Sequence, residues 1–331
     1  MENPGNIHID IEKRGGWESA PLLQEFEFKP YYYLFQVLDP GRISKNFFTD
    51  LSRFQNNEGH YLLVAREGER IVGACAFLVS DWDSRLFGFK YGTVKYLPAE
   101  GGYQESLAVK NEMVRFLLEF CGRMKIEFLH FRVDMADIST IHSLVANGFG
   151  FIASVVRYAV ESANLRPMQK KSPHVDLFQN RDLEQVKRMS KSIFSDNRFS
   201  LDSRFNVDMV NTLYEKWVEN SCLGKVQDKV FVCRKGEEIA GFTTCGLRRK
   251  ESEVLGKRIG AIDLVGVDPR FQGKGIAVKM VNSAVEWLRE NSDVVEAIMA
   301  ARNKPMIRIL ESFGFSWKAS QIDWHRWIGE K

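Results

Sequence analysis

The chain has 331 residues, of which 44% are hydrophobic and 27% are charged, and its formal net charge is +3 at pH 7. This composition is that of an ordinary globular protein, and the length predicts about two domains. The small net charge argues against a nucleic-acid-binding protein. No stretch approaches the roughly 18 uninterrupted apolar residues of a membrane-spanning helix.

The cysteines and histidines show no spacing that is typical of a metal site. The five cysteines include no CxxC pair, and the six histidines form no ligand-spaced cluster. The first residues, Met1–Asn6, lack the basic and apolar regions of a secretory signal. We therefore expect free thiols, no bound metal and a cytoplasmic location.

The first half of the chain alternates strand and helix patterns. Two apolar runs, Leu62–Val64 and Ala74–Phe77, flank a charged turn that contains glycine, which predicts two adjacent strands. The stretch Asn111–Gly122 has apolar residues at helical spacing. A further helix, Ile141–Gly148, ends in a glycine, as a left-handed helix cap requires.

The second half repeats this order of elements. The segment Val64–Gly73 reappears as Val232–Gly241 with six of ten positions identical, and Ile141–Gly148 matches Ile307–Gly314 at nearly the same offset. Repeated supersecondary units indicate a duplicated module. The sequence therefore predicts an α/β fold with two tandem mixed-sheet modules, residues 1–160 and 173–331, joined by a polar, proline-containing linker at residues 161–172.

A glycine-rich turn in the second half is the main candidate binding site. The strand-like run Ala261–Val267 is followed by the turn Gln272–Ala277 and then by a predicted helix, Val278–Arg289. Glycines permit backbone angles that point successive N–H groups into one concavity, and the helix dipole adds positive potential there. The pattern predicts that a diphosphate binds at this turn.

Two familiar phosphate-binding loops do not fit this turn. A dinucleotide fingerprint needs a third glycine, where this chain has Val278. A P-loop needs serine or threonine after its lysine, but Lys274 is followed by Gly275.

The pattern Gln272-x-x-Gly275-x-Ala277 resembles the Q/R-x-x-G-x-G/A motif of the GNAT acetyltransferases. The preceding segment Val265–Pro269 is similar to that family's fourth strand. Asn303, followed by Gly314-Phe315, resembles the family's asparagine-bearing helix and its closing Gly-Phe pair. The resemblance extends over about residues 172–331.

The resemblance implies a set of residues that hold acetyl-CoA or another short acyl-CoA. The backbone of Val265 and Val267 would pair with the pantetheine arm, and Asn303 would hydrogen-bond the cofactor. A backbone N–H near Val265 would also stabilise the oxyanion formed from the thioester. The diphosphate would lie on the N–H groups from Gly273 to Ala277, within the turn Gln272, Gly273, Lys274, Gly275, Ile276 and Ala277.

The equivalent stretch of the first half lacks these features. Residues Val94–Glu105 contain Gly101-Gly102 but no copy of the motif. The counterpart of Asn303 is Asp137, which would bring a carboxylate close to an anionic cofactor. We therefore interpret the first module as a degenerate copy that supports the active one and helps to shape the acceptor pocket.

The catalytic groups are less evident than the binding groups. In the family a tyrosine seven residues after the asparagine commonly serves as the acid, and this chain has Leu310 there. Three residues are candidate substitutes: Asp263 as a base, acting directly or through water, Tyr214 as a phenol donor, and His325 in a predicted last strand near the site. A packing or surface role is the alternative for each, and catalysis by positioning alone needs none of them.

The function that this resemblance implies is acyl-CoA-dependent N-acyl transfer to a small-molecule amine. The segment Asp81–Gly88 resembles part of the dTDP-fucosamine acetyltransferases, two-part members of the family, which favours a nucleotide-linked amino sugar as acceptor. Amino acids, polyamines and protein amines are alternative acceptors. A non-catalytic acyl-CoA-binding protein is the alternative function. The sequence carries no signal for the oligomeric state.

Overall fold

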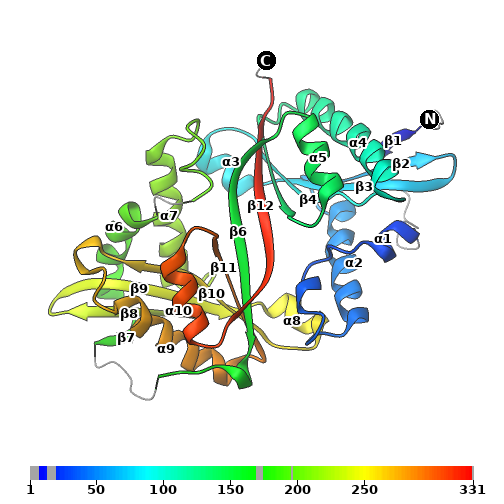
Figure 1. The fold of residues 1–331 in the computed structure, drawn as a ribbon. Coiled ribbons are helices and arrows are strands. Elements are labelled where there is room, and N and C mark those ends of the chain that lie inside the picture. The colour runs from blue at the N-terminus through cyan, green and yellow to red at the C-terminus, as the bar shows by residue number, and fades with distance from the viewer. Residues whose placement is uncertain (1–6, 13–19, 169–173, 195–196, 330–331) are drawn as a thin grey trace. The chain divides into compact units, whose positions relative to one another are not determined.

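The computed structural model describes residues 7–12, 20–168, 174–194 and 197–329, which form two compact α/β units. The first unit contains the described residues up to Ala153, apart from residues 36–38, together with those from Gln321 onward. The second unit contains residues 36–38 and the described residues from Ser154 to Ser320. Figure 1 shows their helices and strands.

The first unit is a mixed sheet in the order β1-β2-β3-β4-β5-β12. Neighbouring strands are antiparallel except β4 and β5, which are parallel. Its strands are β1 (His8–Ile11), β2 (His60–Glu67), β3 (Arg70–Val79), β4 (Tyr91–Tyr96), β5 (Phe128–Asp134) and β12 (Ser316–Trp327). Its helices are α1 (Pro21–Glu25), η2 (Tyr32–Leu34), α2 (Pro40–Asn56), α3 (Asp81–Phe87), α4 (Tyr103–Arg123) and α5 (Ile138–Ala146).

The second unit repeats this arrangement, with the order β6-β11-β10-β9-β8-β7 and one parallel pair, β10 with β11. Its strands are β6 (Gly150–Glu161), β7 (Val175–Leu177), β8 (Lys229–Lys235), β9 (Glu238–Leu247), β10 (Ile259–Val267) and β11 (Val294–Ala300). Its helices are η3 (Ser162–Asn164), η4 (Asn180–Asp182), α6 (Leu183–Ile193), α7 (Val207–Cys222), α8 (Arg249–Leu255), η5 (Pro269–Phe271), α9 (Ile276–Asn291) and α10 (Lys304–Ser312).

The repeated sequence segments form equivalent elements, as predicted. The two strand-turn-strand matches are the hairpins β2–β3 and β8–β9, and the two matched helices are α5 and α10. A repeated glycine lets one helix lie close to each sheet, because a side chain at Gly73 would collide with Val109 on α4 and one at Gly241 with Met280 on α9. Apolar side chains of α4 and α9 then fill the two main cores.

The strands divide between the units differently from the predicted module boundaries. The last strand of the first repeat, β6, pairs with β11 of the second unit through residues 155–161. The last strand of the chain, β12, pairs with β5 of the first unit through residues 321–327. Each repeat thus supplies a final strand to the sheet of the other. Residues 169–172 of the predicted linker lie outside the described residues, whereas Glu161 ends β6 and residues 162–164 form η3.

A buried ion cluster holds β12 on the first unit. The carboxylate of Asp323 on β12 accepts hydrogen bonds from Arg132 Nε at 2.8 Å and Nη2 at 3.0 Å, and His130 Nε2 lies 2.8 Å away. Burial by itself raises the pKa of Asp323, but the Arg132 guanidinium and the two hydrogen-bond partners hold that pKa well below its usual range. The contribution to stability is therefore present above the unfolded pKa, near 4, and is lost as the pH falls below it.

Removal of this charge should unfold the first unit more readily. We expect Asp323→Asn to lower its free energy of unfolding by about 3–5 kcal/mol, because Arg132 would be left without its buried counterion. Urea denaturation at pH 7 measures this loss. Glu112→Gln, which breaks an exposed ion pair with Arg115 on α4, should cost less than about 1 kcal/mol. Equal losses in the two variants would contradict the role of the cluster.

Candidate acyl-CoA site

The second unit contains a place where two parallel strands part. Strand β10 pairs with β11 from Ile259 to Ile262, and within the described residues the pairing goes no further although both strands continue. A bulge interrupts the pairing of β10 with β9 between Ile262 and Leu264. Bulges bend a strand and strengthen its twist, which explains why β10 leaves β11 here.

The backbone of β10 beyond the bulge presents alternate residues to the opening. The Leu264 C=O accepts from Thr243 Oγ1, its N–H donates to Thr244 Oγ1, and the Asp268 N–H donates to the Ala240 C=O, so Leu264 and Asp268 face β9. Because backbone groups of successive strand residues point to opposite edges, those of Val265 and Val267 face the side from which β11 has parted. They form an open strand edge that an extended ligand can pair with.

The glycine-rich turn lies directly after this edge, at the start of α9. Gly273 and Gly275 have φ angles of 73° and 71°, which side-chain-bearing residues rarely adopt, and Gly275 is the N-cap of the helix. Within the described structure, no acceptor is bonded to the N–H groups of residues 273–277. The turn therefore offers several backbone donors and a helix N-terminus to an anion.

The side chains around the turn add cations and fix its shape. Lys274 Nζ donates to the Arg270 C=O at 3.0 Å, and Arg270 pairs with Asp268 at 2.9 Å. The Gln272 side-chain amide donates to the Val267 C=O at 3.4 Å, which ties the turn to the end of β10. The donor set is of the kind that binds phosphate oxygens.

Asn303 caps the helix that follows β11. Its Oδ1 accepts a hydrogen bond from the Met306 N–H at 3.2 Å, and Asn303 is exposed at the start of α10. An asparagine in this position satisfies a helix N-terminus. Its side-chain NH2 group has no acceptor within the described residues, so that it can donate to a ligand.

Asp263 stands in the bulge itself, between Ile262 and Leu264. Its carboxylate accepts hydrogen bonds from Gln227 Nε2 and from the Arg248 guanidinium. Of the three candidate catalytic residues, Asp263 is the one that the structure places at the parting of β10 and β11.

One part of the chain matches a known protein family. Residues 191–315 match the model of the Acetyltransferase (GNAT) family, and this range contains the bulge, the turn and α10. The chain carries a GNAT acetyltransferase domain. The matched range includes the bulge, the glycine-rich turn and Asn303.

Relatives extend the similarity beyond this range. The spore coat polysaccharide biosynthesis protein SpsD of Bacillus subtilis (strain 168) is 25% identical over 270 residues, which is 80% of this chain and 87% of that protein. A GCN5-related N-acetyltransferase from Sphaerobacter thermophilus has a similar structure, with a TM-score of 0.63 at 12% identity and coverage of 97% of this chain and 96% of the other.

A second solved structure has two such modules by its own description. The tandem GNAT protein from the clavulanic acid biosynthesis pathway matches with a TM-score of 0.55 at 13% identity, over 98% of this chain and 99% of the other. At these identities the likeness concerns the fold. It confirms the predicted α/β fold of two tandem GNAT-like modules.

A row of charged side chains that the sequence did not predict lies next to Asp263. Arg248 lies 3.9 Å from Glu296 on β11, and Arg157 on β6 lies 3.7 Å from the same carboxylate. Glu296 is buried, and burying a carboxylate is costly unless cations accompany it. The available signal was a charged residue inside each of two apolar strand sequences, Val155–Val160 and Val294–Ala300.

The structure packs the side chain of Tyr214 among other aromatic rings. Its ring on α7 stacks on Phe194 at a centroid distance of 4.6 Å and on Trp217 at 6.0 Å, and the residue is buried. This agrees with the packing role considered for it in the sequence. A catalytic role for Tyr214 stays a prediction.

His325 belongs to the first unit. Strand β12 places it opposite His130 on β5, buried, with its ring 4.8 Å from that of Phe128. Its position on the last strand was predicted correctly, but this strand completes the sheet of the other module. A catalytic role for His325 also stays a prediction.

Leu310 is a core residue. It is fully buried on α10, within the apolar cluster that includes Phe313 and Leu288. The side chain at the family's usual tyrosine position therefore contributes to packing in this protein.

In the first unit, two buried charged side chains stand at the positions that correspond to Ala277 and Asn303. Because Val109 packs on Gly73 as Ile276 packs on Gly241, the next residue, Lys110, corresponds to Ala277. Lys110 Nζ lies 2.9 Å from the carboxylate of Asp137, the N-cap of α5 and the counterpart of Asn303. Both side chains are buried, and although burial lowers the pKa of Lys110, the Asp137 carboxylate opposes that effect.

The helix N-terminus of the first unit also carries an anion of its own. Helix α4 begins at Tyr103, well before the position that corresponds to the start of α9. The Glu105 carboxylate accepts a hydrogen bond from the Gly102 N–H at 2.8 Å, as the capping box of this helix. The negative charge of Glu105 at this helix N-terminus disfavours a diphosphate there through like-charge repulsion.

No metal site accompanies these residues in the described structure. Within residues 7–12, 20–168, 174–194 and 197–329, no three His, Cys, Asp or Glu side chains are grouped so that they could hold an ion. All five cysteines are free. No helix in the same ranges is long and apolar enough to cross a membrane.

The burial of Leu310 leads to a test of the tyrosine position. We expect Leu310→Tyr to lower the free energy of unfolding by about 1–3 kcal/mol, because the extra atoms and the hydroxyl overpack a closed core. Thermal or urea denaturation measures the loss. Arg308→Tyr, at an exposed position of the same helix, should change stability by no more than about 0.5 kcal/mol. An unchanged stability of Leu310→Tyr would show that the side chain can leave the core.

Proposed function

We propose that this protein transfers an acetyl group from acetyl-CoA to the amine of a small molecule, and that the second unit carries the reaction. The observation that supports this most directly is the continuity of the open edge of β10 with the unoccupied donors of the turn after it. In acyl-CoA the extended pantetheine arm leads to a diphosphate, just as the strand edge leads to the turn in this chain. The family match gives the reaction class.

The residues divide into those that bind the acyl-CoA and those that act on the reacting atoms. The strand edge at Val265 and Val267 binds the pantetheine arm, the N–H groups of residues 273–277 bind the diphosphate, and Asn303 donates to the cofactor. Acetyl-CoA supplies a thioester whose carbonyl carbon bonds to the amine nitrogen while the bond to sulfur breaks. The Val265 N–H, already directed to the opening, donates to the developing oxyanion.

Proton movement is assigned to Asp263. The amine proton passes to this carboxylate, directly or through a water. The hydrogen bonds from Gln227 and Arg248 hold the carboxylate in one orientation. With Leu310 in the core, the thiolate takes its proton from solvent.

The acceptor that we propose is an amino sugar, in particular one linked to a nucleotide. The support is the similarity to SpsD, whose name places it in spore coat polysaccharide biosynthesis, together with the sequence segment Asp81–Gly88. The amine of such a sugar is a small-molecule acceptor. The charged row of Arg248, Glu296 and Arg157 offers both donors and acceptors for hydroxyl groups.

A screen of acceptors tests this function. With acetyl-CoA as donor, thiol release is followed for nucleotide-linked 4-amino sugars, free amino sugars, polyamines, amino acids and lysine peptides. We expect kcat/KM for the nucleotide-linked amino sugars to exceed that of the other classes by at least about tenfold. A higher kcat/KM for another class of amine would contradict the amino sugar as the acceptor. Absence of turnover with every class, despite acetyl-CoA binding, indicates a binding protein.

Binding of the cofactor should depend on the turn and occur once per chain. By calorimetry we expect one acetyl-CoA per wild-type chain, because Lys110 and Asp137 form a buried ion pair at the equivalent position of the first unit. Gly275→Glu should weaken binding by more than about 100-fold, since a carboxylate would meet the diphosphate. Gly236→Glu is the matched control, because Gly236 has a φ of 61° and open space around it in the β8–β9 turn. A stoichiometry near two, or an unchanged affinity of Gly275→Glu, contradicts the placement.

The role of Asp263 is tested by its isosteric amide. We expect Asp263→Asn to lower kcat by about 10²- to 10⁴-fold while leaving the affinity for acetyl-CoA unchanged. Tyr214→Phe, which keeps the ring stack, should stay within about threefold of wild type. Stopped-time assays over a range of pH measure both. A near-wild-type rate for Asp263→Asn would leave positioning alone as the source of catalysis.

A further inference from the structure

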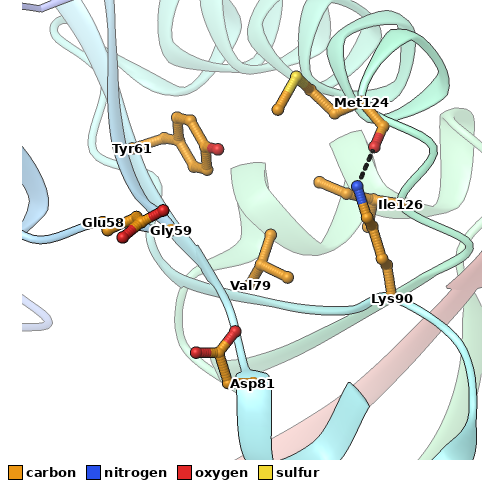
Figure 2. A pocket seen from close by; sticks show the side chains of 8 residues that line it. All are labelled: Glu58, Gly59, Tyr61, Val79, Asp81, Lys90, Met124 and Ile126. Atoms are coloured by element: carbon orange, nitrogen blue, oxygen red, sulfur yellow. Dashed lines mark hydrogen bonds between the residues drawn. The ribbon is translucent and has the colours of Figure 1, made fainter. Parts of the chain in front are cut away.

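The first unit contains a cavity that is lined by none of the proposed cofactor-binding or catalytic residues. It has a volume of about 270 Å³ and lies where β2, β3 and β4 meet the C-terminal end of α4 (Figure 2). Acyl-CoA sites of the kind described above use the opposite ends, the C-terminal end of the equivalent strand and the N-terminus of the equivalent helix. The cavity is lined by Glu58, Gly59, Tyr61, Val79, Asp81, Lys90, Met124 and Ile126.

The inner part of the cavity is apolar and firmly held. Figure 2 shows the side chains of Tyr61, Val79 and Ile126 directed toward one space. The Tyr61 ring stacks on Phe77 with a centroid distance of 4.9 Å and an interplanar angle of 15°, and it meets the edge of Phe120 at 5.2 Å. Such packing fixes one aromatic wall, against which an apolar body can lie at little entropic cost.

The rim of the cavity carries two carboxylates and one ammonium. Glu58 and Asp81 are exposed, and within the described residues neither side chain has a hydrogen-bond or ion-pair partner. Lys90 lies across from them in Figure 2, where its Nζ donates to the Met124 C=O at 2.9 Å. The charges of the rim therefore sum to a negative value.

The end of α4 adds to this negative potential. Met124 is the C-cap of this 21-residue helix, and the last carbonyl groups of a helix carry a partial negative charge. The contact of Lys90 with the Met124 carbonyl shows that a primary ammonium group is accommodated at this helix end. A further cation is favoured by the two carboxylates on the other side.

From these observations we propose that the cavity binds a small primary amine with an apolar body. The ammonium group lies between Glu58 and Asp81, and the apolar part packs on Tyr61, Val79 and Ile126. The volume suits a compact molecule, since pockets for drug-sized ligands start at about 300 Å³. An anion of the same size is disfavoured by the two carboxylates. The proposal does not depend on the acetyl-transfer function.

Three probes with the same phenethyl group test the site: 2-phenylethylamine, the neutral 2-phenylethanol and the slightly larger, anionic 3-phenylpropionate. They are titrated into the full chain without acetyl-CoA, and the Met and Ile methyl groups are followed by NMR. We expect 2-phenylethylamine to shift the signals of Met124 and Ile126 at lower concentration than either of the others. Shifts confined to other methyl groups, or equal binding of the alcohol, overturn the proposal.

Charge-neutral variants complete the test. The double variant Glu58→Gln/Asp81→Asn should weaken binding of 2-phenylethylamine by about tenfold, as expected for two exposed charge interactions. The matched control is Glu69→Gln, an exposed carboxylate in the turn at the other end of the β2–β3 hairpin. It should leave the affinity within about twofold. Equal weakening in the control, or none in the double variant, contradicts the proposed place of the ammonium group.

Discussion

The parting of β10 from β11 is the feature on which the candidate site depends. Backbone N–H and C=O groups need hydrogen-bond partners, and within a sheet a neighbouring strand supplies them. When the bulge at Asp263 turns β10 away, the groups of Val265 and Val267 lose that neighbour, while those of Leu264 are satisfied by threonine hydroxyls of β9. An open edge of this kind, continued by the donors of a glycine-rich turn, is suited to a long ligand that ends in phosphates.

The two repeats show how small changes close such a site. The first repeat also has a bulge on β4, between Val94 and Tyr96, so the strand geometry alone does not separate the copies. The difference lies in the helix that follows. Where the second unit has Ala277 and a neutral Asn303, the first has Lys110 and Asp137, which form a buried ion pair. The two charged side chains occupy this position in the first unit, and truncating one of them would leave the other buried without its partner.

The charged row beside Asp263 contains an ion pair between residues of the two repeats. Arg157 comes from the last strand of the first repeat, yet it pairs with Glu296 of the second unit. A GNAT domain cut at the predicted boundary of residue 173 would lack this arginine and the whole of β6. The exchange of final strands therefore gives the first repeat a part in the surroundings of the second repeat's site, beside its own fold.

Sequence alone predicted the features that depend on local pattern. The duplicated strand-turn-strand units, the matched helices with their terminal glycines and the turn from Gln272 to Ala277 all follow from residue types at fixed spacing, because turns and periodic faces are set by neighbouring residues. The family resemblance at Gly275 and Asn303 belongs to the same class of information.

Contacts between segments far apart in the chain were decided only by the tertiary structure. The pattern of β6 and β12 predicts strands, but strand patterns do not state which sheet they join, and here each joins the sheet of the other repeat. His325, expected beside the site of its own repeat, was thereby assigned to the first unit. Leu310 is in the core for the same kind of reason, since the packing of α10, rather than its sequence, determines which face is buried. Long-range pairing and packing are set by the whole core, and no local window of sequence contains them.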